Sequence, residues 1–380
     1  MTENEQTIYT GGLIFDGHQL LEKHNVVVAN GLVTSVLPDS AREGAQTCID
    51  LNGDILSVGY ADLQVNGGGG KLFNDAPSVE SLTTIAHAHR KLGTTCFLPT
   101  LITDTPHVTE AAIDAVSAAM RTNVSSVAGL HLEGPHLSVL KKGAHLASYI
   151  RPMQQSDLNV LLKFSDDIAL LKVTVAPENV TCNQVSALAE AGVIVALGHT
   201  NASYATCMEY HAAGARCVTH LYNAMSQLGS REPGLVGAAL DAPELAVGLI
   251  ADGVHVHEAA IRIAWNTKAN EQQLYLVTDA MALAGTTLNS FTLNDRTISR
   301  QNGRLTLEDG TLAGADVDLT TSIRFLRNNV GVDLVDALRA SVAVPRRILG
   351  LNKDTSELIG QSVSDVIRIS AELDTVSNLQ

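Results

Sequence analysis

Two stretches of the chain decide the fold: GVIVALGHT at residues 192–200 and ARCVTHLYN at residues 215–223. Each is an apolar run that leads into a histidine, His199 in the first and His220 in the second. Such near-continuous apolar runs are typical of strands that are buried on both faces of a parallel sheet. Parallel α/β proteins bind ligands at the carboxyl ends of their strands, so these histidines point to a functional site.

The same pattern repeats along the chain. Amphipathic runs such as residues 78–93, 183–192 and 257–270 lie between the apolar ones and predict helices, often ending in glycine as a helix C-cap does. Eight strands that alternate with helices predict an α/β fold of the (β/α)8 TIM-barrel type, whose usual size is ~250 residues. An open doubly wound sheet is the alternative, but no G-x-G-x-x-G motif follows a first strand. The eight strand candidates are residues 55–65, 94–102, 126–133, 170–178, 193–199, 216–223, 245–255 and 274–280.

The two ends of the chain have a different character from the middle. The N-terminal stretch is rich in short β-like runs, residues 316–350 continue as helices, and residues 357–370 return to β character. We therefore expect residues 1–53 and 351–380 to form one small β-sandwich domain. Residues 54–350 would form the barrel, which would be the catalytic domain.

The composition excludes several classes of protein. A formal net charge of −15 would repel nucleic acid. No apolar stretch approaches the ~20 residues of a membrane helix, and the first residues lack a signal-peptide layout, so we expect a cytoplasmic protein with no membrane partner. The five cysteines are scattered without a C-x-x-C pair, so we expect small core fillers rather than disulfides or a thiolate zinc site.

Two carboxylates join the histidines at predicted strand ends. Glu133 closes the third strand candidate and Asp279 the eighth, and a barrel would bring both to the same cavity mouth as His199 and His220. Two imidazoles and one carboxylate match a catalytic zinc site, which keeps one position open for water. A divalent metal lowers the pKa of its water from ~15.7 towards ~7. Asp279 would then be the general base.

Each of these residues also has a plainer interpretation. A single histidine at a strand end is more often a hydrogen-bonded structural residue than a ligand. Asp279 could cap a helix that starts in DAMALAG. His131 shares a strand face with Glu133, and we expect a supporting or packing role for it. His87 and His89 are expected on a helix surface, and Lys141 with Lys142 could be a solvated charge pair.

A series of motifs resembles the N-acetylglucosamine-6-phosphate deacetylase family of the amidohydrolase superfamily. The motifs run in the family's order and include HLEGPHLS (131–138), KKGAH (141–145), LGHTNASY (197–204), THLYNAMSQL (219–228) and VTDAMALAG (277–285). The resemblance implies metal-dependent hydrolysis of the N-acetyl amide of N-acetylglucosamine 6-phosphate. The galactosamine epimer, or another cyclic amide, is the nearer alternative. A non-catalytic sugar-phosphate-binding homologue is the more distant one.

The resemblance also implies roles for particular residues. Glu133, His199 and His220 would hold one divalent ion per chain, with zinc expected and iron, cobalt or manganese as alternatives. Gln64 and Asn66 stand where many amidohydrolases carry the H-x-H of a second metal, so we expect a single ion. Arg231 would reach the phosphate in the neighbouring subunit of a homodimer. Asp279 and His145 would act on the scissile amide, and the contacts to the sugar phosphate would come from Gln64, Ala144, His145, Asn223, Ala224, Asp252, Gly253, Val254, His255 and a loop of Leu312, Ala313 and Gly314.

Overall fold

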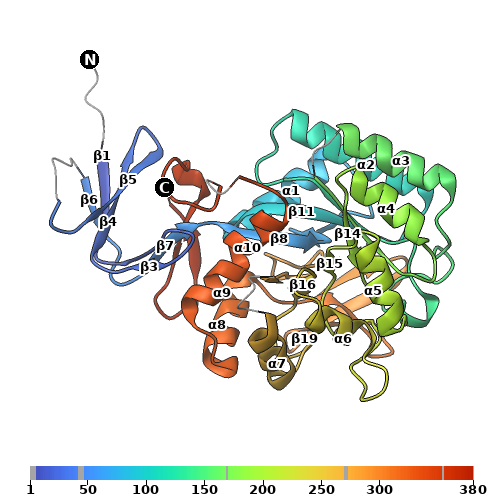
Figure 1. Cartoon of the computed structure of the whole chain (residues 1–380). Helices are drawn as coiled ribbons and strands as arrows, with labels where there is room; N and C mark the ends of the chain where they lie inside the picture. The colour runs from blue at the N-terminus through green and yellow to red at the C-terminus, as the bar shows by residue number, and fades with distance from the viewer. Residues whose placement is uncertain (1–5, 42–46, 168–169, 269–272, 353–354, 380) are drawn as a thin grey trace.

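Eight parallel strands form a barrel in the larger, helix-covered part of the molecule (Figure 1). The computed structural model describes residues 6–41, 47–167, 170–268, 273–352 and 355–379. Val65 at the end of β8 forms a bridge with Ala280, which lies just beyond β17, so the ring is nearly closed. The predicted (β/α)8 barrel is therefore confirmed. Its strands are β8 (Tyr60–Val65), β11 (Thr94–Ile102), β12 (Leu130–Glu133), β13 (Leu171–Val175), β14 (Ile194–Leu197), β15 (Cys217–Val218), β16 (Ala246–Leu249) and β17 (Leu274–Leu276).

Helices surround the barrel, and the sequence fixes their ends. The Thr181 side chain accepts a hydrogen bond from the backbone of Gln184 in a capping box that starts α4. Gly93 and Gly192 adopt left-handed φ values of 84° and 83° after α1 and α4, as C-cap glycines do. The helices are α1 (Val79–Lys91), α2 (Pro106–Arg121), α3 (Gln155–Asp167), α4 (Cys182–Glu190), α5 (Tyr204–Ala212), α6 (Gly234–Asp241), α7 (Glu258–Lys268), α8 (Leu319–Phe325), α9 (Leu334–Ser341) and α10 (Ala343–Ile348), with a π-helical turn at Leu326–Val330.

The barrel strands have apolar side chains on both of their faces. Leu63, Leu98 and Tyr275 are fully buried in one cluster, whereas Leu132 and Val173 belong to the larger cluster that includes the helices. This two-sided burial explains why the strands appear in the sequence as apolar runs without polar alternation.

Both ends of the chain contribute to a β-sandwich beside the barrel (Figure 1). The predicted first strand, residues 55–65, is divided between the two parts: β7 pairs with β22 in the sandwich and β8 pairs with β11 in the barrel. Gly59 separates them, and a Cβ there would lie 2.2 Å from Thr95 Cγ2. One sheet holds β5 (Leu32–Pro38), β4 (His24–Ala29), β1 (Gln6–Thr10) and β6 (Thr47–Asp50), and the other holds β23 (Val376–Asn378), β22 (Val366–Ile369), β7 (Ile55–Val58), β2 (Leu13–Phe15) and β3 (Leu20–Leu21).

A four-stranded antiparallel sheet after β17 was not predicted. Its strands are half exposed and carry alternating polar residues, so a search for apolar runs passes over them. Leu312, Ala313 and Gly314 lie in its last strand, so the expectation that they form a loop is wrong. The strands are β18 (Ser290–Leu293), β19 (Arg296–Gln301), β20 (Arg304–Thr306) and β21 (Leu312–Ala315), and a two-residue pair, β9 (Gly67–Gly68) with β10 (Lys71–Leu72), precedes α1.

Several expectations about single residues need correction. His89 is buried, with its Nε2 2.9 Å from the Gly67 carbonyl oxygen, because its side of α1 packs on the barrel. Cys48 is exposed and Cys182 only half buried, so the core-filler interpretation holds for Cys96, Cys207 and Cys217. Within the ranges that the structure describes, no helix has the length and apolar character needed to cross a membrane.

Candidate active site

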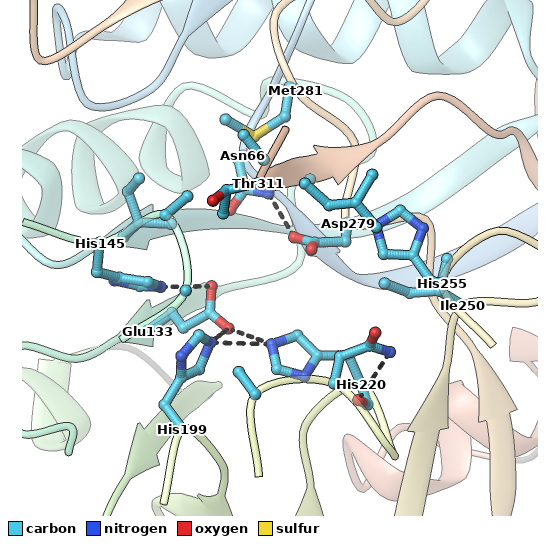
Figure 2. Close-up of a pocket in the computed structure, with 18 of the residues that line it drawn as sticks. Asn66, Glu133, His145, His199, His220, Ile250, His255, Asp279, Met281 and Thr311 are labelled. Atoms are coloured by element: carbon cyan, nitrogen blue, oxygen red, sulfur yellow. Dashed lines mark hydrogen bonds and ion pairs between the residues drawn. The ribbon is translucent and has the colours of Figure 1, made fainter. Parts of the chain in front are cut away.

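The four predicted residues lie together at the carboxyl end of the barrel (Figure 2). Glu133 is the last residue of β12, whereas His199, His220 and Asp279 lie just beyond β14, β15 and β17. These three have left-handed φ values of 47°, 30° and 52°. Such a backbone costs about 1–3 kcal/mol for a non-glycine residue and is common at functional sites.

Hydrogen bonds hold these strained turns. The carbonyl oxygens of His199, His220 and Asp279 accept from the backbone N–H groups of Ser138, Asn223 and Ala315, at 2.9, 3.0 and 3.1 Å. His220 is therefore held within its own loop, whereas His199 and Asp279 are held by the loop after β12 and by β21. No helix follows Asp279, since the next residues form turns, so its interpretation as an N-cap is wrong.

Glu133, His199 and His220 present one compact set of donor atoms. Glu133 Oε1 lies 3.0 Å from His220 Nε2 and 3.3 Å from His199 Nε2, and the two Nε2 atoms are 3.0 Å apart. All three side chains are buried. Two imidazole nitrogens and a carboxylate oxygen that converge in this way match the donor set of a zinc-type ion.

Hydrogen bonds outside this cluster fix which nitrogen of His199 can bind a metal. Its Nδ1 lies 2.8 Å from the Lys141 carbonyl oxygen, so Nδ1 carries the proton and Nε2 keeps its lone pair for a ligand. His131, by contrast, has both ring nitrogens bonded to threonine hydroxyls, at 3.1 Å to Thr100 and 2.8 Å to Thr174. His131 therefore supports the barrel interior.

His145 also borders the cluster, but its hydrogen bonds give it a different role. Its Nε2 lies 3.8 Å from Glu133 Oε2, and ligand atoms of Glu133, His145 and His199 lie within 4.8 Å of one another. Thr103 offers His145 Nδ1 its backbone N–H at 3.3 Å and its hydroxyl at 2.8 Å. Burial is the main cause that lowers the pKa of His145 to about 3, so the ring is neutral and its proton lies on Nε2. In this tautomer Nε2 is a hydrogen-bond donor, which makes it unsuitable as a metal ligand.

Asp279 lies across the cavity from this cluster (Figure 2). Its Oδ1 accepts hydrogen bonds from Gln64 Nε2 at 3.1 Å and from Asn66 Nδ2 at 2.7 Å. The same Gln64 nitrogen donates to Glu133 Oε1 at 3.1 Å, so one amide spans both carboxylates. Burial and the charge of Glu133 raise the pKa of Asp279. Gln64 thus serves the carboxylates, and it does not line the cavity.

A cavity of about 390 Å³ opens in front of these groups. Asp252 and His255 form a pair on its border, with Oδ2 and Nδ1 2.6 Å apart. Arg231, Asp252, Gly253 and Val254 are not among the lining residues, and Arg231 is exposed in the loop before α6. The predicted residues that line it are Glu133, Ala144, His145, His199, His220, Asn223, Ala224, His255, Asp279, Leu312, Ala313 and Gly314.

Sequence reasoning missed part of the cavity wall. The loop after β17 contributes Met281 to this wall. The sheet that was not predicted contributes Leu293 from β18 and Thr311 from the turn before β21. Arg296 of that sheet donates from Nη2 to the Ala144 carbonyl oxygen at 2.6 Å, beside His145. Met281 lies within VTDAMALAG, but no quoted motif contains Leu293, Arg296 or Thr311, because their position depends on how the sheet folds back over the barrel.

The chain is similar to known proteins over most of its length. Residues 55–358 match the amidohydrolase family, and residues 8–56 match the NagA composite domain. The N-acetylgalactosamine-6-phosphate deacetylase of Shewanella sp. (strain ANA-3) is 37% identical, with 89% of this chain and 87% of the relative covered. The N-acetylglucosamine-6-phosphate deacetylase of Haemophilus influenzae is also 37% identical, with 90% and 89% covered.

Solved structures show the same arrangement of the whole chain. The N-acetylglucosamine-6-phosphate deacetylase of Pasteurella multocida superimposes with a TM-score of 0.91 at 32% identity, covering 98% of this chain and 97% of the other. A mutant of the Mycobacterium smegmatis enzyme, in complex with N-acetyl-D-glucosamine-6-phosphate, gives a TM-score of 0.88 at 28% identity, covering 98% and 97%.

Proposed function

The chain belongs to the amidohydrolase family, and from this premise we propose that it hydrolyses the N-acetyl amide of N-acetylglucosamine 6-phosphate in the cytoplasm. The products are acetate and glucosamine 6-phosphate. The observation that carries the proposal is the convergence of Glu133, His199 and His220 within 3.3 Å of one another, with Asp279 held on the facing wall. The names of the relatives support the substrate class.

One divalent metal ion per chain fits these residues. The Nε2 atoms of His199 and His220 lie 3.0 Å apart and within 3.3 Å of Glu133 Oε1 in a buried setting, and a bound cation would neutralise the charge of the buried carboxylate there. Glu133, His199 and His220 would hold the ion, which supplies Lewis-acid activation of water and of the amide carbonyl. Gln64 and Asn66 donate to carboxylates through their nitrogens, and their uncharged amide oxygens are weaker ligands than the imidazoles of an H-x-H pair, so we propose no second ion. Zinc suits this ligand set, as do iron, cobalt and manganese.

Asp279 is the proton carrier of the reaction. Its Oδ1 is occupied by the amide nitrogens of Gln64 and Asn66, so we assign Oδ2 as the atom that accepts a proton from the attacking water. The raised pKa of this buried carboxyl favours proton uptake. The protonated Oδ2 then donates to the amide nitrogen as the carbon–nitrogen bond breaks, because an unprotonated amine is a poor leaving group.

His145 stabilises the negative charge that develops on the carbonyl oxygen. Its Nε2 carries the proton, and Thr103 fixes the ring through Nδ1. A neutral donor held in this way is already oriented towards the developing oxyanion, which is an efficient form of transition-state stabilisation. After the amine leaves, acetate and the amino sugar phosphate dissociate from the open side of the cavity.

The remaining cavity residues would hold the sugar and its phosphate. Ala144, Asn223, Ala224, His255 and the Leu312–Ala315 strand line the space in front of the reactive groups. Asp252 orients His255 through the bond to its Nδ1. Among the described lining residues, Lys141 is the one lysine or arginine, so a phosphate dianion calls for a further cation. We propose that Arg231 of the second subunit in a homodimer supplies it.

N-acetylgalactosamine 6-phosphate is the second candidate substrate. The Shewanella relative that carries this name is as similar to the chain as the Haemophilus enzyme, at 37% identity each. The two sugars differ only in the configuration at C4.

Acetate release from both epimers, measured with metal content on the same sample, tests the proposal. We expect turnover of the gluco epimer with one equivalent of metal per chain. Faster turnover of the galacto epimer would reassign the substrate. Acetate release from neither sugar by the metal-loaded protein would favour a non-catalytic homologue, and two metal equivalents at full occupancy would contradict the single site.

A further inference from the structure

A second cavity lies outside the barrel, between α2, α3 and the outer faces of β12 and β13. It has a volume of about 290 Å³. Pro106, Glu110 and Ser156 are exposed on its border, so the α2–α3 cavity opens to the surface. Its lining contains none of the proposed metal ligands or sugar-binding residues, and the deacetylase mechanism leaves it unused.

The floor of the α2–α3 cavity is apolar and deeply buried. Leu132, Val173 and Val175 contribute their outward-facing side chains, and Met153 with Leu161 completes the wall. A space of this size with walls of this kind suits a small aromatic molecule, since ligand sites are mostly apolar with few polar groups.

The charged groups of this cavity disfavour an anionic ligand, and its apolar floor disfavours the burial of a cation. Arg151 and Asp157 pair through two bonds, Nη1 to Oδ2 at 2.5 Å and Nη2 to Oδ1 at 2.7 Å. Their charges therefore cancel within the wall. Glu110 at the border is the remaining charged lining residue among those the structure describes, and it would repel an anion.

His136 is the polar group that could recognise a ligand. Its side chain is buried, and its Nδ1 lies 3.0 Å from the Arg151 carbonyl oxygen, which can only accept a hydrogen bond. Nδ1 therefore carries the proton, and Nε2 is an acceptor. Burial lowers the pKa of His136, which keeps the ring neutral and preserves this acceptor.

We propose that the α2–α3 cavity binds a small, uncharged, planar molecule whose single N–H or O–H group donates to His136. The walls match the apolar body of such a molecule, and the imidazole matches its donor. This site is separate from the deacetylase cavity, and binding to it does not depend on the proposed function, whereas an effect of that binding on deacetylation rests on it.

The α2–α3 cavity touches the backbone on both sides of a proposed metal ligand. Leu132 and Gly134 line it, and Glu133 lies between them with its side chain on the opposite face of the strand. The hydroxyl of Thr103 lies 3.3 Å from the Glu133 carbonyl oxygen, and a Cβ on Gly134 would lie 2.2 Å from that hydroxyl, so the segment is tightly packed. A ligand against this segment would shift Glu133 and slow the deacetylation.

Isothermal titration with indole tests the proposal, with benzofuran as the control because it has the same shape without the N–H donor. We expect saturable binding of one indole per chain and roughly tenfold weaker binding of benzofuran, the loss of one hydrogen bond. Absence of saturable indole binding would overturn the site. Equal affinities of the two compounds would overturn the assigned ligand class. Both measurements use the unaltered protein.

Two tryptophan variants of α3 locate the binding. Val160 lines the cavity, so Val160→Trp should fill it and abolish indole binding. Asn159 is exposed on the same helix outside the lining, so Asn159→Trp should leave binding intact. Indole binding that survives Val160→Trp would place the ligand elsewhere.

Deacetylation measured with saturating indole tests the link to Glu133. We expect a roughly twofold or greater fall in rate in the unaltered protein and none in Val160→Trp, because small displacements of reacting groups reduce rates. An unchanged rate in the unaltered protein would overturn this link.

Discussion

Asp279 is the single residue on which the proposed chemistry depends most directly. Its Oδ1 is held by two amides, and the ion is assigned to other residues, so Asp279→Asn should remove proton transfer while leaving the metal bound. We expect turnover to fall by about 10²–10⁴-fold, the usual range for loss of general acid–base catalysis. The assay is acetate release with metal content on the same sample. Retained turnover would remove Asp279 from the mechanism.

Thr103 acts on the site only through His145 and Glu133, so a substitution of Thr103 tests whether the positions of these two residues affect the rate. Thr103→Val removes the hydroxyl that lies 2.8 Å from His145 Nδ1 and 3.3 Å from the Glu133 carbonyl oxygen. We expect kcat to fall roughly tenfold with KM little changed, because His145 would act mainly on the transition state. Thr103→Ser, which keeps the hydroxyl, should restore most of kcat. A change confined to KM would contradict this role.

The reactive residues at the strand ends could be identified from the sequence. The residues that hold them through hydrogen bonds could not. Glu133, His199, His220 and Asp279 were found because each follows an apolar run. Thr103 also follows an apolar run, residues 94–102, but a threonine there does not by itself indicate metal or proton chemistry. Its role comes from a contact with His145 across 42 positions of the chain. Hydrogen bonds of this kind arise only when the barrel closes.

The antiparallel sheet after β17 is the element that sequence reasoning missed, and it forms part of the active-site wall. Arg296 on β19 donates to the Ala144 carbonyl oxygen at 2.6 Å and so fixes the loop that carries His145. Arg296→Met should lower kcat/KM roughly tenfold, since it loses a charge-assisted hydrogen bond. Steady-state kinetics on N-acetylglucosamine 6-phosphate measure this.

A neighbouring arginine provides the control for this element. Arg304 on β20 is exposed, so Arg304→Met removes the same charge from the same sheet without touching Ala144. We expect kinetics close to those of the unaltered protein. Equal losses in the two variants would mean that Arg296 acts through the overall charge and not through the loop.

At the scale of the whole molecule, the barrel was predictable because eight apolar runs alternate with capped helices. The position of the break between barrel and sandwich was harder to predict, since β7 and β8 follow each other directly in the sequence with only Gly59 between them. An interface between two copies of the chain is harder still to predict from one sequence. The role of Arg231 therefore needs an experiment on the assembled protein.

Mixing two variants, one impaired in binding the phosphate and one without turnover, tests whether each active site is shared between subunits. Arg231→Ala should weaken binding of the phosphorylated sugar far more than binding of a sugar without phosphate. Asp279→Asn should lack turnover. After subunit exchange, a mixed dimer has one site with both an intact Asp279 and an intact Arg231 from the partner, so an equal mixture should recover ~25% of the unaltered rate if subunits pair at random. Arg231 is not among the residues that line the cavity of its own chain, so recovery of activity would indicate that the second subunit supplies it. A mixture that forms mixed dimers, shown by differently tagged chains, yet stays inactive would mean that Arg231 does not reach the neighbouring site.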